Sequence, residues 1–187
     1  HSDQIYLLED ILPRFVFPHL RFLELDELEV NFQRYPDATP LDALCKIIGN
    51  SRCELQSIRL HLLDESERPP HHESALGSLL QRTQCTLQTL IIEGTGFTGA
   101  FLQGFKPERL ENFVIQDSRE EVEVRMHLNL AQWLRSHTQR EGGRERCQKL
   151  NTIFCCQDGG FVSCDEWKRL EEDGFPFSLF SANALDT

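Results

Sequence analysis

The chain has 187 residues, of which 40% are hydrophobic and 26% are charged, an ordinary globular composition that excludes disordered and collagen-like classes. Its 30 acidic and 19 basic residues give a net charge of −11, which disfavours nucleic acid and anionic membrane surfaces as partners. No apolar stretch is long enough to span a bilayer, and we expect a single domain over residues 1–187.

A short apolar phrase, Leu-x-x-Φ-x-Φ with Φ apolar, recurs along the chain. Its alternation is that of a strand with one buried face, and recurrence at intervals of tens of residues is typical of stacked units. The five occurrences are Leu20-Leu23-Leu25, Leu55-Ile58-Leu60, Leu87-Leu90-Ile92, Leu110-Phe113-Ile115 and Leu150-Ile153-Cys155.

The segments between the first phrases change to helical spacing. Thr39 and Pro40 are a typical N-cap and first helical residue, and residues 41–48 carry an apolar stripe at steps of three and four residues. Segment 64–73, which contains paired prolines and His71-His72, predicts a loop. The helix expected after that loop carries Leu76, Leu79 and Leu80.

The later connections are expected to differ in length. Glycines in segment 94–99 predict a turn into a short segment, 100–105, which Pro107 prevents from continuing as a helix. Apolar residues at helical spacing then predict the longest connecting helix, and Trp133 and Trp167 are interpreted as core or capping aromatics. The apolar residues of this last helix are Leu128, Leu130, Trp133 and Leu134.

The phrase Leu20-Arg21-Phe22-Leu23-Glu24-Leu25 resembles the strand phrase of the leucine-rich repeat family. Cys53, Cys85 and Cys147 stand just ahead of the second, third and fifth phrases, where each is expected to follow a helix. These cysteines resemble the cysteine-containing subtype found in the substrate-binding half of F-box proteins, particularly the divergent fungal ones.

The resemblance implies an α/β fold: a short, irregular leucine-rich-repeat solenoid with parallel strands on its concave face and helices on its convex face. It implies about five repeats over residues 18–160 and a C-terminal capping segment over 161–187. The F-box module itself is absent from the sequence, because Leu12-Pro13 lies too close to the first phrase. A ligase adaptor would therefore bind only through a missing N-terminal module.

Aligning the five phrases predicts three rows of residues across the concave face, where such solenoids usually bind partners. The first row is Phe22, Ser57, Thr89, Asn112 and Thr152; the second is Glu24, Arg59, Ile91, Val114 and Phe154; the third is Asp26, His61, Glu93, Gln116 and Cys156. The candidate partner-binding residues are Phe22, Glu24, Asp26, Arg59, His61, Ile91, Glu93, Val114, Gln116 and Phe154.

The second row predicts an apolar patch, because Ile91, Val114 and Phe154 would be neighbours on an exposed face. A partner protein is one expected cover for this patch. The aromatic tail over residues 175–180 is the other, since it could fold back against the final repeat.

Seven cysteines form an odd count without the dense spacing of a secreted disulfide scaffold, which predicts a cytoplasmic or nuclear protein. Cys147, Cys155, Cys156 and Cys164 raise the hypothesis of a zinc site. No Cys-x-x-Cys pair is present among them, so we expect neither a metal nor a cofactor.

The sequence favours a protein–protein interaction module, with a partner on the concave face or the rim loops. The resemblance makes the substrate-recognition part of an F-box-type ubiquitin ligase receptor the most concrete form, and an architectural or inhibitory repeat protein is an alternative. We expect no enzymatic activity, because phosphate-binding loops, nucleophile elbows and zinc-protease motifs are all missing. In an alternative α/β hydrolase or transferase, Asp26, His61 and Glu93 are the aligned set that would serve.

Overall fold

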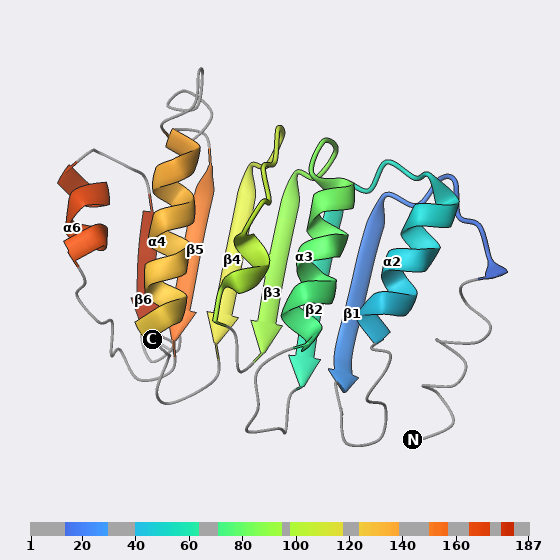
Figure 1. The fold of residues 1–187 in the computed structure, drawn as a ribbon, viewed down its shortest axis with the longest axis horizontal. Coiled ribbons are helices and arrows are strands. Elements are labelled where there is room, and N and C mark those ends of the chain that lie inside the picture. Colours follow the sequence, from blue (N-terminus) through green and yellow to red (C-terminus); the bar gives the residue numbers. More distant parts are fainter. Residues whose placement is uncertain are drawn as a thin grey trace.

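A computed structural model describes residues 14–29, 40–63, 71–94, 98–117, 124–138, 150–156, 165–172 and 177–181. These residues form an α/β fold with a parallel sheet and helices packed against it (Figure 1). Within them, the six strands are β1 (Phe22–Glu29), β2 (Ser57–Leu63), β3 (Thr89–Gly94), β4 (Asn112–Asp117), β5 (Asn151–Cys156) and β6 (Phe177–Ser181). The strands lie in the sheet in the order β1-β2-β3-β4-β5-β6, which is also their order in the chain.

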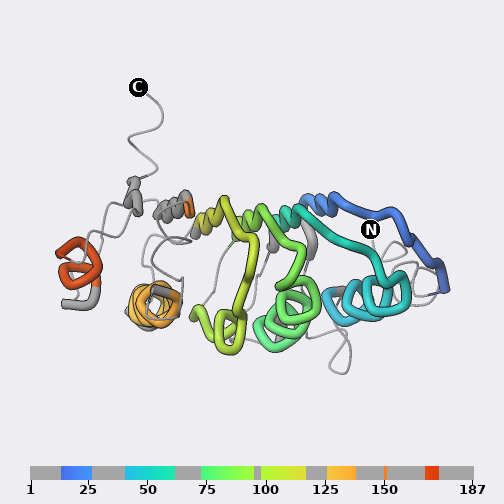
Figure 2. The backbone as a smooth tube through the Cα atoms, turned by 90° about the horizontal axis from the view of Figure 1, so that it is seen from above, coloured from blue at the N-terminus to red at the C-terminus, as the bar shows by residue number. Residues whose placement is uncertain are grey.

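Helices connect successive strands and lie on one face of the sheet (Figure 2). The helical elements of the described part of the chain are α2 (Pro40–Ser51), α3 (His71–Thr83), the 3-10 turn η3 (Ala100–Leu102), α4 (Val124–Thr138) and α6 (Asp165–Glu172). Parallel strands need such crossover connections, because a tight hairpin can join only antiparallel neighbours.

The hydrophobic core fills the space between the sheet and the helices. Each of the first four phrases contributes strand residues to it, and Ile58, Leu90 and Phe113 are completely buried at equivalent positions. The helices contribute the predicted stripes: Leu41, Leu44, Ile47 and Ile48 from α2, Leu76, Leu79 and Leu80 from α3, and Leu130, Trp133 and Leu134 from α4 are all buried. The helical periodicity therefore identified the core side of three connections.

Two helical predictions need correction. Helix α3 begins at His71, so His71 and His72 form its first turn instead of ending a loop, and Glu73 in the same turn is buried. Leu128, assigned to the apolar stripe of α4, has 38% of its surface exposed, since the buried stripe runs through Met126, Leu130 and Leu134. In a helix with 3.6 residues per turn, an apolar residue at the edge of the buried stripe can be exposed. The sequence alone did not show that Leu128 is this residue.

The described part of the C-terminal tail, residues 177–181, lies against β5, which confirms that the tail folds back against the last phrase. Its form was not predicted: Phe177–Ser181 is the strand β6, which pairs in parallel with β5 from Thr152↔Phe177 to Cys156↔Ser181. Helix α6 precedes it, and Trp167 on that helix is buried in the core as expected. The tail thus extends the sheet by one strand.

Candidate functional site

The predicted rows lie on the face of the sheet opposite the helices, which we call the strand face. In the sheet, Glu24 pairs with Arg59, Arg59 with Ile91, and Ile91 with Val114, so the second row is confirmed over four strands. The first row is confirmed over the same strands. Along β3 the exposure alternates, with Leu90 and Ile92 buried on the helix side and the row residues only half-buried.

The fifth member of each row is wrong by one residue. Val114 pairs with Ile153 and Ile115 with Phe154, so Phe154 does not continue the second row. In the first four phrases the leucine lies two residues before the strand begins, whereas Leu150 lies one residue before Asn151. Strand β5 reads Asn-Thr-Ile-Phe-Cys-Cys, and four consecutive apolar residues fix no register by alternation.

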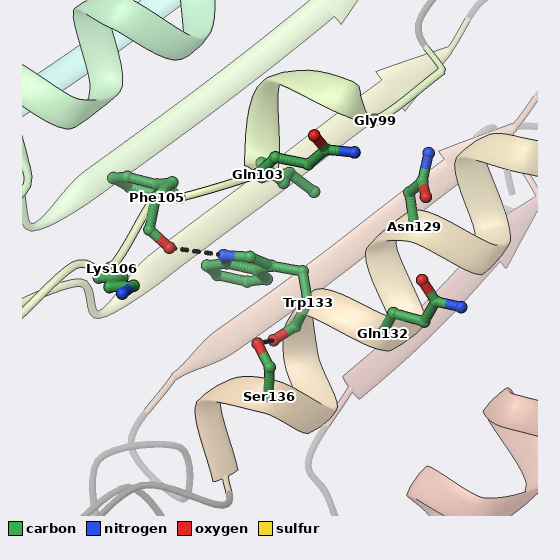
Figure 3. Close-up of a pocket in the computed structure, with 10 residues that line it drawn as sticks. Gly99, Gln103, Phe105, Lys106, Asn129, Gln132, Trp133 and Ser136 are labelled. Atoms are coloured by element: carbon green, nitrogen blue, oxygen red, sulfur yellow. Dashed lines mark hydrogen bonds between the residues drawn. The ribbon is translucent and has the colours of Figure 1, made fainter.

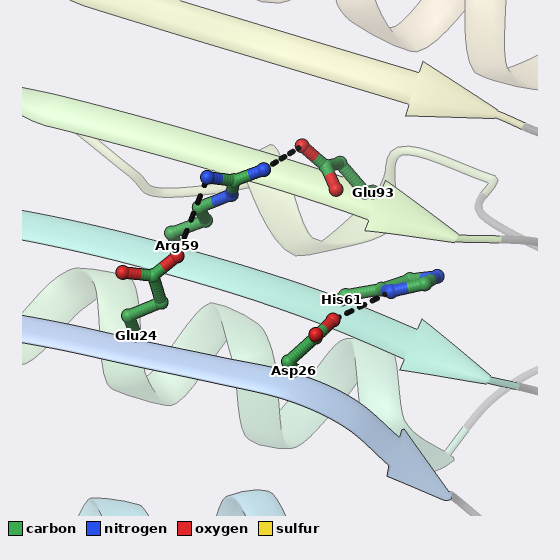
Figure 4. A network of polar contacts seen from close by, with 5 residues as sticks. All are labelled: Glu24, Asp26, Arg59, His61 and Glu93. Atoms are coloured by element: carbon green, nitrogen blue, oxygen red, sulfur yellow. Dashed lines mark hydrogen bonds and ion pairs between the residues drawn. The ribbon is translucent and has the colours of Figure 1, made fainter.

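An ion-pair network crosses the first three strands of the strand face (Figure 4). The Arg59 guanidinium reaches Glu24 on β1 through Nη1, at 3.3 Å from Oε1, and Glu93 on β3 through Nη2, at 3.2 Å from Oε1. The three side chains retain 48%, 69% and 25% of their exposure respectively, so each pair contributes at most about 1 kcal/mol to stability. The network therefore orders the surface more than it stabilises the fold.

A second contact joins the third row. Nδ1 of His61 lies 2.9 Å from Oδ1 of Asp26, and Asp26 is in the irregular part of β1. There the register changes, because Leu25 pairs with Leu60 but Leu28 pairs with Leu62, which leaves two residues of β1 opposite one of β2. The first two members of the third row, Asp26 and His61, are thus neighbours through a side-chain contact, although the strand register is irregular there.

Apolar side chains flank the charged network. Phe22 at the start of β1 is 70% exposed, and Ile91 and Val114 are half-buried neighbours on β3 and β4. Gln116, also on β4, is exposed. The strand face therefore has a charged area on β1 to β3, with Phe22 on one side of that area and Ile91 and Val114 on the other.

The trio required by the enzyme alternative is divided between two contacts. Asp26 approaches His61, whereas Glu93 is held by Arg59 and belongs to the ion-pair network. The acidic member of the close pair, Asp26, keeps 81% of its side-chain exposure, so water has access to the contact. The three residues therefore do not form one cluster on the strand face.

The helix-end cysteines lie where the sequence placed them. Cys53 follows α2 and Cys85 follows α3, each two residues beyond the helix and two before the phrase leucine. Within the described residues, no group of three or more potential ligands could hold a metal ion. Cys147 and Cys164 lie outside the described residues, so the zinc hypothesis is not addressed by this geometry.

Burial raises the pKa of the thiol groups of two described cysteines, Cys45 and Cys53. It raises the pKa of Cys45 to about 11, with the neighbouring Asp42 carboxylate adding to the effect. The Cys45 thiol donates a hydrogen bond to the carbonyl oxygen of Ala75 at 3.4 Å, which ties α2 to α3. Burial also raises the pKa of Cys53. Both thiols are therefore structural in character, since the reactive form is the thiolate.

Sequence reasoning missed a buried carboxylate. Glu73 in the first turn of α3 accepts hydrogen bonds from the backbone N–H groups of Thr98, Gly99 and Ala100 and from the Thr98 hydroxyl, the last at 2.7 Å. It thereby satisfies the free N–H groups at the start of η3, as a capping side chain does. Its position in a polar run, Pro-Pro-His-His-Glu, gave no periodic signal of burial.

The chain was compared with known proteins, and it matches no protein-family model, no curated protein and no solved structure. Among the described helices, none combines the length and apolar character needed to cross a bilayer. Arguments about function therefore depend on the geometry of the strand face.

Proposed function

We propose that this protein is a protein-interaction module that binds another protein through the strand face. One observation carries the proposal: among the described residues, the helices cover only the opposite side of the sheet, and the strand face presents Phe22 at 70% exposure beside an ordered charge network. An exposed aromatic side chain next to an arginine is the composition found at the energetic centre of many interfaces.

A second group of exposed apolar residues precedes β1 and lies beside the end of α2, because the Phe17 N–H donates to Ser51 Oγ at 2.9 Å. Phe15, Val16 and Phe17 are 50%, 58% and 39% exposed, and the rings of Phe15 and Phe17 stack with centroids 6.2 Å apart. Scattered exposed apolar residues are normal, but among the residues that the structure describes most of the large ones lie in or just before β1. This concentration favours binding over a purely scaffolding role for that end of the sheet.

We also propose the finer architecture, a short and irregular leucine-rich-repeat solenoid. The support is the strict agreement between strand order and chain order, the helix that follows most strands, and the cysteines that end α2 and α3. In this proposal the strand face is the concave face. The most concrete function is the substrate-recognition part of an F-box-type receptor, in the cytoplasm or nucleus, whose adaptor contact lies in a separate N-terminal module.

Affinity capture from a native extract tests the binding proposal. The wild type is compared with the double variant Phe22→Ser/Arg59→Glu, which changes two exposed positions and leaves the core intact. Lys46→Glu is the matched control, because Lys46 is an exposed cation on α2, on the helix side. Proteins captured by the wild type and by the Lys46 variant, but lost with the double variant, support the proposal. Identical capture by all three proteins contradicts it.

The F-box form needs its own test. Its parent polypeptide, expressed with any segment that precedes residue 1, should recover a ligase adaptor, and the 187-residue chain should not. If the parent recovers no adaptor while the double variant still loses its partner, the ligase role is wrong and the interaction role remains.

A further inference from the structure

A groove lies on the helix side of the sheet, between η3 and α4 (Figure 3). Its volume is about 260 Å³, slightly below the usual range for small-molecule sites, so it would hold a group of one or two residues in size. Gly99 and Gly104, both with positive φ of about 80°, contribute no side chains to fill it. The groove is separated from the strand face by the sheet, so it is independent of the proposed interaction surface.

Hydrogen bonds fix both walls of the groove. The indole Nε1 of Trp133 donates to the carbonyl oxygen of Phe105 at 2.9 Å, and the two rings stack with centroids 5.9 Å apart. The Asn129 amide donates to the carbonyl oxygen of Thr98 at 2.8 Å. Since α4 is thereby joined to both ends of the η3 segment, the groove is preformed and a ligand would not need to open it.

One side of α4 forms the helical wall. Asn129, Gln132, Trp133 and Ser136 recur at steps of three and four residues, so they share one face of the helix. The Ser136 hydroxyl donates to the Trp133 carbonyl oxygen at 2.8 Å, which leaves its oxygen as an acceptor toward the groove. The stripe is therefore an aromatic floor with polar side chains along it.

The charge of the groove is opposite to that of the whole chain. Its lining includes Lys106 and no carboxylate, although acidic residues outnumber basic ones by 30 to 19 in the sequence. Both segments that form it, 99–107 and 124–138, contain no Asp or Glu at all. Within the described residues, Lys106, Gln103 and Gln132 make no side-chain hydrogen bond or ion pair, so their donors are available to a ligand.

We propose that this groove binds a carboxylate that carries a short apolar group, as the C-terminus of a peptide does. The Lys106 ammonium pairs with the carboxylate, the apolar group lies against Leu102 and Trp133, and the Gln103 and Gln132 amides bond to the adjoining peptide unit. A free aliphatic acid has the same carboxylate and apolar group but lacks the peptide unit. The two sources therefore differ in whether the glutamine amides contribute.

Titration followed by two-dimensional ¹H–¹⁵N NMR tests the proposal, with the Trp133 indole N–H as reporter. The chain has two tryptophans, and Trp167→Phe assigns the indole signal without touching the groove. The probes are N-acetylglycyl-leucine, its C-terminal amide and 4-methylpentanoate. Lys106→Ala tests the cation, Gln132→Ala tests the amide contact, and Lys46→Ala is the control at an exposed lysine on another helix.

The acetylated dipeptide should shift the Trp133 signal in a saturable manner, and its amide should not. Lys106→Ala should weaken binding by about threefold or more, the range expected for one exposed charge pair, whereas Lys46→Ala should leave it unchanged. A peptide end is identified as the ligand if 4-methylpentanoate binds more weakly than the dipeptide and Gln132→Ala lowers the affinity for the dipeptide. If 4-methylpentanoate binds as tightly as the dipeptide, the ligand is a small carboxylic acid. The proposal is overturned if no carboxylate shifts the Trp133 signal. It is also overturned if the dipeptide amide binds as tightly as the free dipeptide and Lys106→Ala binds the dipeptide as tightly as the wild type.

Discussion

Removal of the Glu73 carboxylate should destabilise the protein more than most single changes at a polar residue. The carboxylate is 2% exposed and is the acceptor for three backbone N–H groups and one hydroxyl at the start of η3. In Glu73→Ala these donors lose their partner. A small side chain at this position also cannot bridge α3 to the segment that begins at Thr98, 25 residues further along the chain.

The magnitude follows from where each donor lies. The Gly99 N–H contact is buried, and an unpartnered donor there costs about 1 to 3 kcal/mol. The other contacts are partly buried, so water replaces some of each bond and the loss is nearer 0.5 to 1 kcal/mol per group, about 4 kcal/mol in total. For a domain of this size that lowers Tm by roughly 8 to 16 °C.

Urea titration and thermal melting, both followed by circular dichroism, measure the effect. Glu73→Gln retains the shape and one acceptor oxygen and should lose about half as much stability, because the new amide group faces the Ala100 N–H without accepting from it. Glu54→Gln is the matched control, since Glu54 is exposed. If Glu73→Ala and Glu54→Gln both unfold within about 0.5 kcal/mol of the wild type, the capping argument is refuted.

Three further predictions, made with four substitutions, test other parts of the fold. Gly99→Ala should cost about 2 kcal/mol in urea titration, because φ there is 80° and a Cβ would lie 3.0 Å from that of Asn129; an unchanged midpoint contradicts this. Phe113→Ala should cost about 3 to 5 kcal/mol and Phe22→Ala less than about 0.5 kcal/mol, because the first ring is buried and the second is exposed; equal losses would falsify the assignment of the two sheet faces. The Cys45 thiol has a pKa of 9.0 when unfolded and about 11 when folded, so its contribution is complete below pH 9 and is lost as the pH rises toward 11. The stability difference between wild type and Cys45→Ala should therefore narrow over that range, and a constant difference argues against burial of the thiol.

Apolar periodicity predicted the parts of the fold that a single repeating rule controls. A residue such as Leu90 faces the core because every second strand position does, and the same rule placed Arg59 opposite Glu24. The rule failed in β5, where consecutive apolar residues remove the alternation. It also gave no prediction for β6, whose five residues were interpreted only as an aromatic tail.

The polar features of the structure depended on information that the sequence does not carry locally. Glu73 reads as a solvent-exposed residue until the segment at Thr98 is brought beside it by packing of η3 against α3. The groove forms only where residues 99–106 pack against α4. Its lysine and amide side chains follow no regular spacing in the sequence, so no pattern predicted them. Conversely, the pairing of Glu24 with Arg59 was expected from row alignment, because strand register brings distant positions together in a regular way.

The agreement between strand order and chain order has a consequence for how this fold could assemble and change. Since each strand pairs with its neighbours in the sequence, paired residues are separated by about 40 positions or fewer. The loops that must close during folding are therefore short, and the entropy lost in closing each one is small. The two sheet edges, β1 and β6, are the first and last strands described. Loss of β1 or of β6 would therefore break only one seam of backbone hydrogen bonds, with β2 or with β5, and would leave the pairings of the other described strands in place.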